Sequence, residues 1–516
     1  MTTTPFQNEP LTDFGDPANH QAFQQALDRV EAQFGREHPL VIGGDRVTTG
    51  EWITSIDPSE HTRAVGKVAR AGKAEADRAL EAAWQAFATW SRVPGDERAR
   101  IGLRAAAIMR RRRHELSATM VLEVGKSWIE ADADTAEAID FLDYYGRQAE
   151  RIGQPQPLTP ARGTENDLLY LPLGVGLAIP PWNFPLAIAT GLVASAVLTG
   201  NTVIFKPASV APVIGAAIVD VLEEAGVPRG VVNFLPGPGD TVGDYLVGHP
   251  RVRFVNFTGS RDVGVHINEL AARLTPGQRW IKRVVAEMGG KDAIVVHSTA
   301  DVEAAIAGIT ASAFGYQGQK CSACSRVIAE SSVYDRVVAG VVERAEQLRL
   351  GQAKRFETEV GPVVDASQFR KVSEYIAIGR GEGRLVAGGE TDDEVGYFIH
   401  PTVFADLAPD SRVMQEEIFG PVLGITRARD FDEALAIANG TIYGLTGGVY
   451  ARDPEVLMRA RHEFHVGNLY LNRKITGALV GVEPFGGFDM SGTDSKAGGE
   501  DYLKLFLQAK VISERL

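Results

Sequence analysis

The chain has 516 residues, too many for one hydrophobic core, so two or three domains are expected. Its formal net charge of −13 excludes general binding to nucleic acids and to anionic membranes. The longest apolar run, residues 186–199, is too short to span a bilayer, and the first residues lack the basic and apolar regions of a signal peptide. Two cysteines cannot crosslink a fold of this size, so the chain is predicted to be cytoplasmic.

The first 150 residues are predicted to be mainly helical. Apolar residues recur there at helical spacing, with one strand ending in a turn at 39–44. The expected helices cover residues 19–34, 73–90, 96–113, 115–125 and 127–145. Four arginines at 110–113 end one helix, which favours a solvated helix end over an anion site. A proline-rich run at 154–160 then marks a connection.

After an exposed strand at 166–173, apolar strands alternate with helices. The strands are expected at 175–179, 202–205, 231–235, 252–257 and 284–286. The helices are expected at 186–199, 211–225, 240–247 and 261–272. Continuous apolar strands separated by helices predict a parallel sheet covered on both faces, a doubly wound nucleotide-binding architecture. Such a sheet binds its ligand at the carboxyl ends of the strands.

A second alternating series begins at Asp292. Its strands are expected at 293–296, 326–329, 402–404, 422–427 and 469–472, and its helices at 302–314, 333–348 and 431–439. The tail, residues 502–511, is apolar with polar interruptions, as in a strand. A strand at the end of a chain stays exposed unless it pairs with another segment.

Both cysteines, Cys321 and Cys324, lie in one stretch, residues 318–326. A nucleophilic thiol must ionise, and Lys320 and Arg326 flank Cys321 on either side. The spacing also fits a dithiol redox pair, half of a zinc site or two inert thiols. A zinc site needs about four ligands, and a dithiol pair needs a thioredoxin-like context that the neighbouring residues lack. This stretch alone does not decide whether Cys321 is a nucleophile or both cysteines are inert thiols.

Two further motifs follow predicted strands. In residues 181–185, two prolines and two aromatic residues would hold the Asn183 amide rigidly, as a donor to an oxyanion must be held. A rigid aromatic corner is the alternative. Residues 257–264 open a helix with two glycines, as at a pyrophosphate site, although the spacing departs from the dinucleotide fingerprint. A plain strand-to-helix turn explains them equally well.

Glu287 ends the first strand series and is followed by Met288, Gly289 and Gly290. A carboxylate beside such a mobile backbone suits a base that works on water. Surface carboxylates are common, so this motif is weak by itself.

Taken together, the motifs resemble the aldehyde dehydrogenase superfamily over nearly the whole chain. They stand in the order of that family at residues 181–185, 206–208, 257–260, 287–291, 318–321 and 416–421. The resemblance implies an α/β fold: a Rossmann-like dinucleotide-binding domain, an α/β catalytic domain and a small β oligomerisation element. It also implies that Cys321 attacks an aldehyde, that Asn183 and the Cys321 N–H hold the oxyanion, and that Glu287 activates the hydrolytic water.

The cofactor implied by the resemblance is NAD, and no metal. The residues that would bind it are Pro181, Trp182, Lys206, Ser209, Gly259, Ser260, Glu417 and Phe419. One residue departs from the family: Ser209 stands where many members carry an acid that repels a 2′-phosphate. Use of NADP is therefore expected as well, with Arg261 close enough to attract the phosphate.

Within the superfamily the likeness is strongest to the L-glutamate γ-semialdehyde (1-pyrroline-5-carboxylate) dehydrogenases of proline catabolism. It rests on residues 136–141, 317–323 and 476–487. In that subfamily, backbone amides and a serine bind the substrate α-carboxylate and an aromatic ring covers its stem. The corresponding residues here are Ser322, Gly477, Ala478 and Phe485. Another small semialdehyde, such as succinic semialdehyde, is the alternative substrate.

The resemblance also implies a homo-oligomer, either a dimer or a trimer of dimers. Its domains would comprise an N-terminal helical part of the dinucleotide-binding domain (1–159), an oligomerisation hairpin (160–178), a Rossmann-like core (179–290), a catalytic domain (291–485) and a C-terminal segment with an oligomerisation strand (486–516). The partners expected are a small-molecule substrate and further copies of the chain, with no nucleic acid and no membrane.

Overall fold

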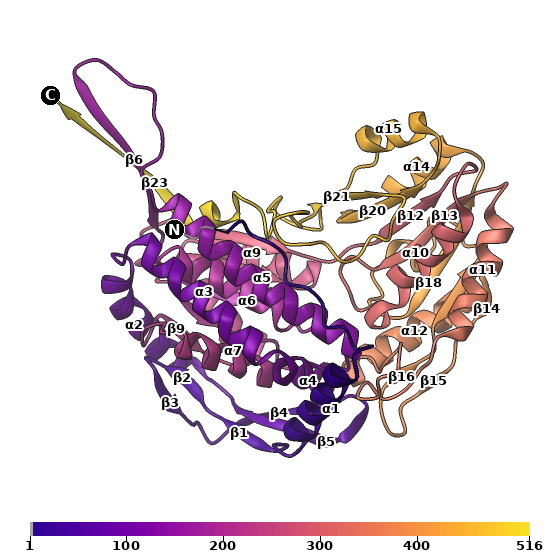
Figure 1. Ribbon diagram of the computed structural model, residues 1–516, viewed down its shortest axis with the longest axis horizontal. Coiled ribbons are helices and arrows are strands. Elements are labelled where there is room, and N and C mark those ends of the chain that lie inside the picture. Colours follow the sequence, from indigo (N-terminus) through magenta and orange to yellow (C-terminus); the bar gives the residue numbers. More distant parts are fainter. Residues whose placement is uncertain (1–3) are drawn as a thin grey trace.

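Two seven-stranded sheets organise the protein, and the computed structural model describes residues 4–516 (Figure 1). The first sheet has the order β11-β10-β7-β8-β9-β2-β3. Its parallel strands are β7 (Val175–Ile179), β8 (Thr202–Phe205), β9 (Val232–Phe234), β10 (Phe254–Thr258) and β11 (Arg283–Glu287). The hairpin of β2 (Leu40–Ile42) and β3 (Asp45–Val47) extends it antiparallel at one edge. The predicted parallel sheet is present.

Helices cover this sheet because its strands are apolar throughout. The covering helices are α2 (Lys73–Trp90), α6 (Ala187–Leu198), α7 (Pro212–Glu224), α8 (Asp244–Gly248) and α9 (Arg261–Ala272). Nearly every residue of α6 is buried, since α3 (Gly95–Arg111) and α5 (Trp128–Ile152) pack over it. Helix α4 (Arg113–Val124) packs on α5 and α7, and α1 (Pro17–Glu31) packs on α4. The N-terminal helices therefore form a second layer over the helices that lie directly on the sheet.

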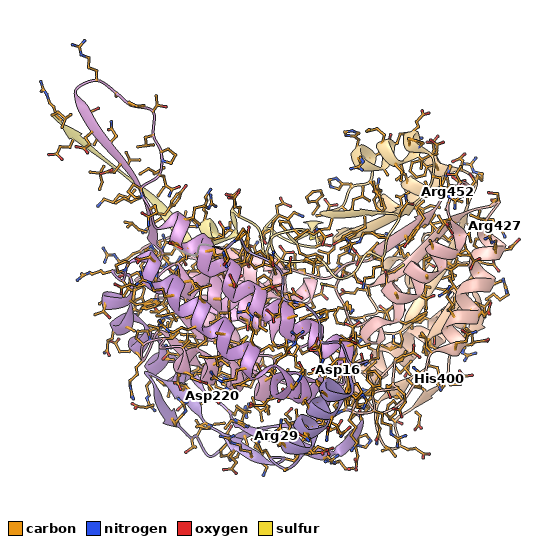
Figure 2. The ribbon with its side chains drawn as sticks, viewed as in Figure 1. Asp16, Arg29, Asp220, His400, Arg427 and Arg452 are labelled. Atoms are coloured by element: carbon orange, nitrogen blue, oxygen red, sulfur yellow. The ribbon has the colours of Figure 1, made fainter. Side chains whose placement is uncertain are left out.

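The second sheet has the order β14-β17-β18-β13-β12-β20-β21 and is parallel except at β14. Its strands are β12 (Asp292–Val296), β13 (Cys324–Glu330), β14 (Arg384–Ala387), β17 (Thr402–Ala405), β18 (Val422–Ala428), β20 (Thr446–Tyr450) and β21 (Asn468–Leu471). Its helices include α10 (Val302–Phe314), α11 (Tyr334–Gln347), α12 (Ala366–Glu382), α14 (Phe431–Asn439) and α15 (Pro454–Glu463). Charged side chains such as Asp220, His400 and Arg452 lie on the outside of the molecule (Figure 2).

The mainly helical prediction for the front of the chain missed a three-stranded sheet. It consists of β1 (Arg36–His38), β4 (Trp52–Asp57) and β5 (Glu60–Ala69) in the order β1-β5-β4. Charged residues interrupt these strands, and their positions mix buried, half-buried and exposed side chains. Their polar sequence therefore lacks the apolar alternation that announces a strand.

The C-terminal strand β23 (Leu507–Arg515) pairs antiparallel with β6 (Thr164–Pro172) along its whole length. This two-stranded antiparallel ribbon, whose strands come from distant parts of the sequence, projects away from the rest of the protein (Figure 1). Every residue of β23 after Leu507 is exposed. The strand expected at 502–511 begins only at Leu507, because Tyr502–Phe506 form a short 3-10 helix, and only β6 covers the edge of the strand within residues 4–516.

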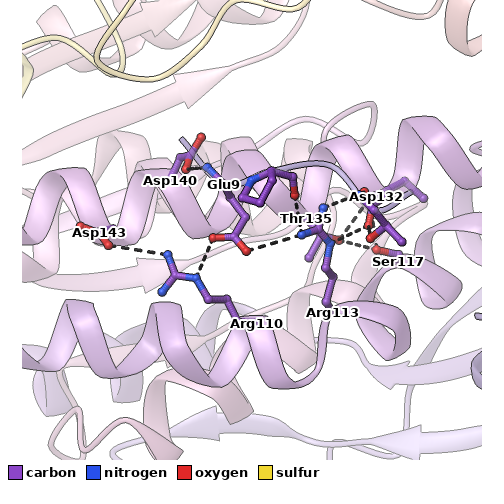
Figure 3. A network of polar contacts seen from close by, with 11 residues as sticks. Glu9, Arg110, Arg113, Ser117, Asp132, Thr135, Asp140 and Asp143 are labelled. Atoms are coloured by element: carbon purple, nitrogen blue, oxygen red, sulfur yellow. Dashed lines mark hydrogen bonds and ion pairs between the residues drawn. The ribbon is translucent and has the colours of Figure 1, made fainter. Parts of the chain in front are cut away.

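The four arginines at 110–113 are partly solvated, since the Arg110 and Arg111 side chains are 39% and 61% exposed, but, unlike a free helix end, each of the four contacts a carboxylate. Arg110 donates to Glu9, and Arg113 donates to Asp132 at 2.6 Å and to the Pro10 carbonyl (Figure 3). Each of the other two arginines also contacts a carboxylate. The difference arises because the N-terminal segment folds back across α3 and α5, which no local pattern could indicate.

No helix within residues 4–516 has both the length and the apolar character needed to cross a membrane.

Candidate active site

A cavity of about 400 Å³ lies between the carboxyl ends of the first sheet and the loop that holds Cys321. Residues from both halves of the chain line it. The predicted site residues among them are Glu287, Cys321, Ser322, Gly477, Ala478 and Phe485. Six positions spread over 200 residues of sequence thus share one cavity, as the motifs predicted.

The half-buried Cys321 follows α10 and a strained turn. Tyr316 and Gln317 have φ of 50° and 55° there, values that side-chain-bearing residues seldom adopt. Burial and the nearby carboxylates, Asp292 first among them, raise the pKa of the Cys321 thiol well above its ordinary value. The free enzyme therefore holds a protonated thiol, and its attack requires a base to remove the proton.

Asn183 lies directly against the nucleophile loop. Its side chain is buried, and Nδ2 donates to the Gln319 carbonyl at 3.1 Å. That bond uses one of the two amide hydrogens and fixes the plane of the amide. No acceptor for the second hydrogen is found within residues 4–516.

Glu287 ends β11 at the edge of the cavity. Its carboxylate accepts from the Ser495 hydroxyl and, at 3.2 Å, from the Gly487 N–H. Burial raises the pKa of Glu287 to about 8 in spite of these two donors. Ser495 was missed by sequence reasoning, because 208 residues separate the two side chains and no motif surrounds it.

The proposed cofactor residues lie at the carboxyl ends of three adjacent parallel strands, where such sheets bind nucleotides. Pro181 and Trp182 follow β7, Lys206 follows β8, and Gly259 and Ser260 follow β10. The Ser260 hydroxyl caps α9 by accepting from the Val263 N–H.

Glu417 and Phe419 reach the same region from the second half of the chain. The Phe419 ring meets the Trp182 ring edge to face, with centroids 5.4 Å apart. The Glu417 carboxylate accepts from the Gly290 N–H at 3.1 Å. Trp182 and Phe419 therefore link the two halves of the chain beside the predicted nucleotide site.

Lys206 fits a ribose hydroxyl partner. Its side chain is almost fully buried, and its ammonium has no hydrogen-bond or ion-pair partner within residues 4–516. Burial lowers its pKa to about 8. A buried donor without an acceptor is costly, so a ligand that accepts from it would relieve that cost.

Arg261 does not contact Ser209. Its guanidinium donates to the adjacent Asp262 and lines a surface groove with Glu417 and Tyr443. Ser209 lies exposed on the turn after β8. The expected role of Arg261 toward a 2′-phosphate therefore gains no support from the geometry.

Two lysines that the motifs did not assign also line the cavity. The Nζ of Lys320 donates to Glu130 at 2.7 Å, and Lys474 lies beside Gly477. These cations share the cavity with Ser322, Gly477 and Ala478. The charge and donors suit a carboxylate ligand.

Glu137 on α5 lines the same cavity. The motif at residues 136–141 contains it, but no role for its side chain was predicted from the sequence. Within residues 4–516 it has no hydrogen-bond or ion-pair partner, and burial raises its pKa to about 8. A cationic ligand group would stabilise its charged form. Glu9 and Leu11 of the N-terminal segment also reach the wall.

Cys324 begins β13 and lies in the apolar core, where Sγ contacts the Arg326 carbonyl at 3.3 Å. It does not line the main cavity. Within residues 4–516, no three His, Cys, Asp or Glu side chains gather closely enough to hold a metal ion.

A thiol and a buried carboxylate in one cavity, a buried amide bonded to the loop of the thiol, and a parallel nucleotide-type sheet beside them define a dehydrogenase with a cysteine nucleophile. The chain belongs to the aldehyde dehydrogenase family, whose model matches residues 46–512. The predicted fold is confirmed by solved structures of that class.

Three relatives illustrate the similarity. The 1-pyrroline-5-carboxylate dehydrogenase of Geobacillus thermodenitrificans (strain NG80-2) is 58% identical over 510 residues, which cover 99% of each chain. A crystal structure of 1-pyrroline-5-carboxylate dehydrogenase from Thermus with bound NAD is 56% identical, with a TM-score of 0.99 and full coverage of both chains. Lactaldehyde dehydrogenase from Escherichia coli is 32% identical, with a TM-score of 0.88, covering 93% of this chain and all of that one.

Proposed function

We propose that the protein oxidises L-glutamate γ-semialdehyde, which forms from 1-pyrroline-5-carboxylate, to L-glutamate with NAD as the cofactor. The full-length relatives at 54–59% identity bear the name of this activity, and the Thermus relative was solved with NAD. The chemistry of the cavity supports the same substrate independently of those names.

The observation that carries the proposal is the pairing of opposite charges in one cavity. Lys320, Lys474 and the amides of Gly477 and Ala478 suit the α-carboxylate of the substrate. The partnerless carboxylate of Glu137 suits its α-ammonium group. Succinic semialdehyde, the alternative substrate, has a carboxylate but no ammonium group and would leave Glu137 unpaired.

Catalysis begins at Cys321. Sγ attacks the aldehyde carbon while the thiol proton passes to solvent in the cavity, and a thiohemiacetal forms. The developing oxyanion accepts from the free Nδ2–H of Asn183 and from the Cys321 N–H. Asn183 is already oriented by its bond to Gln319, so little reorganisation accompanies the attack.

NAD, when bound, accepts the hydride from the thiohemiacetal carbon, which leaves a thioester on Cys321. Lys206 would hold the adenosine ribose, and Ser260 would contact the pyrophosphate. Glu287 then takes a proton from water, which attacks the thioester. The acid product departs and the sulfur of Cys321 is released.

Substrate specificity tests the proposal. NADH formation is measured by absorbance with glutamate γ-semialdehyde, succinic semialdehyde and an uncharged aldehyde of equal length. We expect the highest kcat/KM with glutamate γ-semialdehyde, because only that substrate satisfies both charged ends of the cavity. Equal or higher kcat/KM with succinic semialdehyde would favour the alternative.

Ser209 gives the second prediction. A carboxylate at this exposed turn would repel a 2′-phosphate, so Ser209→Glu should lower kcat/KM with NADP at least about tenfold, or roughly 1.4 kcal/mol. Activity with NAD should stay within a few-fold, since Lys206 still contacts the ribose hydroxyls. Wild-type protein should use NADP measurably while preferring NAD.

Ser209→Gln is the matched control, because it adds the same bulk without charge. It should treat NADP as the wild type does. A wild-type protein that ignores NADP, or a Glu variant with unchanged cofactor preference, would contradict the role of Ser209.

The assembly is a further part of the proposal. We infer a homo-oligomer, a dimer or a trimer of dimers, bridged by the projecting ribbon of strands β6 and β23. Val511 and Ile512 are 65% and 39% exposed on β23, and Leu171 is 37% exposed on β6. Apolar side chains on an uncovered strand pair favour contact with another copy.

Deleting residues 508–516 should therefore reduce the oligomer to a smaller species, measured by light scattering. The cut follows Leu507 because Leu503 and Phe506 are fully buried, and a cut after Tyr502 would damage the core. Exchanging Val511 and Ile512 for serine keeps the strand and should weaken assembly less. An unchanged mass after the deletion would show that the β6–β23 ribbon does not form the interface.

The division of the chain at residues 159, 178, 290 and 485, and its cytoplasmic location, stay predictions.

A further inference from the structure

Lys126 is a fully buried lysine outside the residues assigned above. It lies between α4 and α5, and its side chain and that of Asp134 are both 0% exposed. Its Nζ stands 3.2 Å from Oδ2 of Asp134. A buried charged pair stabilises a fold little more than apolar packing would, so its presence calls for another explanation.

The surroundings of this ammonium join the two catalytic segments. Nζ lies 4.0 Å from the centroid of the Phe184 ring and 4.1 Å from that of the Tyr316 ring. Phe184 is the neighbour of Asn183, and Tyr316 begins the turn that leads to Cys321. A cation between two ring faces attracts both, and more strongly where water is absent.

Each segment is also tied separately to the same place. Oδ1 of Asp134 accepts from the Ala187 N–H at 2.6 Å, which anchors the start of α6 just after the Asn183 segment. The Tyr316 hydroxyl donates to the Val124 carbonyl at 3.0 Å, and Nε2 of Gln317 donates to the Gly125 carbonyl at 2.9 Å. Lys126 follows these two carbonyls directly in sequence.

The two segments then meet at the reacting atoms. Asn183 Nδ2 donates to the carbonyl of Gln319, two residues before Cys321. The turn between Tyr316 and Cys321 has unfavourable backbone angles at Tyr316 and Gln317, so surrounding contacts must hold it. Lys126 is the cation that contacts both sides of this junction.

We propose that Lys126 is a positioning residue that holds the Asn183 segment against the Cys321 segment, so that the amide hydrogen and the sulfur face one carbonyl group. The inference rests on the proposed aldehyde oxidation and adds the residue that sets its geometry. Lys126 touches neither substrate nor cofactor and acts through Phe184, Tyr316 and Asp134.

The test compares steady-state NADH formation in wild type and Lys126→Met, measured below the melting temperature of each protein. Methionine keeps most of the bulk and removes the charge. We expect kcat to fall at least about tenfold, since small misplacements of reacting groups cost up to about a hundredfold. KM for the aldehyde should change by less than about threefold, because the substrate contacts remain.

The paired variant Lys126→Met/Asp134→Asn guards against misfolding, because it leaves no unpaired buried carboxylate and retains the acceptor for Ala187. It should lose as much kcat as the single variant. Tyr316→Leu removes the ring that Lys126 contacts and should reproduce the loss. Lys282→Met is the matched control: this buried lysine donates to the Val247 carbonyl at 2.5 Å, away from the cavity, and its loss should leave kcat near wild type.

A double-mutant comparison separates positioning from general stability. In an Asn183→Ala background, Lys126→Met should have little further effect on kcat, because the amide that it positions is gone. Three outcomes would each overturn the proposal. They are an undiminished effect of Lys126→Met on kcat in the Asn183→Ala background, a wild-type kcat in Lys126→Met/Asp134→Asn, and a loss of kcat in Lys282→Met as large as that in Lys126→Met. Absence of aldehyde oxidation in the wild type would instead count against the proposed function.

Discussion

Cys321→Ser should abolish aldehyde oxidation, with kcat reduced at least about a thousandfold, the scale seen when a hydrolase loses its nucleophile. The structure explains why serine cannot replace the thiol. Burial and the surrounding carboxylates already raise the pKa of the Cys321 thiol, and a hydroxyl ionises far less readily at the same place. Steady-state NADH formation measures the loss, and a thermal melt shows that the variant is folded.

Cys324→Ser is the control, since Cys324 lies three residues away but points into the core. We expect its kcat to stay within a few-fold of wild type. The comparison also tests the dithiol reading of the two cysteines, which requires both sulfurs. If Cys324→Ser lost activity and Cys321→Ser kept it, the assignment of the nucleophile would be wrong.

Glu287→Gln should release one equivalent of NADH in a burst and then nearly stop. The thiol proton passes to solvent, and the thiohemiacetal and the hydride transfer use Cys321, Asn183 and the cofactor but not the Glu287 carboxylate, so the first turnover proceeds. Hydrolysis needs a base for water, and an amide cannot accept that proton. Stopped-flow absorbance resolves the burst, and intact-protein mass spectrometry detects the accumulated thioester. An unchanged steady-state rate would remove Glu287 from the mechanism.

The same residue predicts a pH dependence. Because burial raises the pKa of Glu287 to about 8, the neutral acid predominates at pH 7 and the carboxylate base at pH 9. Thioester hydrolysis in the wild type should therefore accelerate as the pH rises through about 8. Glu287→Gln should lose this rise. A wild-type hydrolysis rate that is flat between pH 7 and 9 would show that another group supplies the base.

Local pattern predicted the regular elements well where one face of an element is buried. The helices at 73–90 and 302–314 end where the apolar spacing predicted, because that spacing is itself the packing face. Local pattern did not predict several elements that are rich in polar residues. The strands at 52–57 and 60–69 were not predicted because charged residues interrupt their apolar alternation, although the two strands pair with each other. The helix at 366–382 was also not predicted, although its buried residues fall at helical spacing.

By itself, the sequence determined the family and the parallel sheet and predicted the roles of Cys321, Asn183 and Glu287, because short contiguous motifs carry each of them. Only the tertiary structure decided what surrounds them. Ser495 orients Glu287, Glu137 lines the cavity, and Lys126 lies between the Phe184 and Tyr316 rings. Those contacts join residues dozens to hundreds of positions apart, and such proximity arises only when the sheets and helices pack, so no local pattern encodes it.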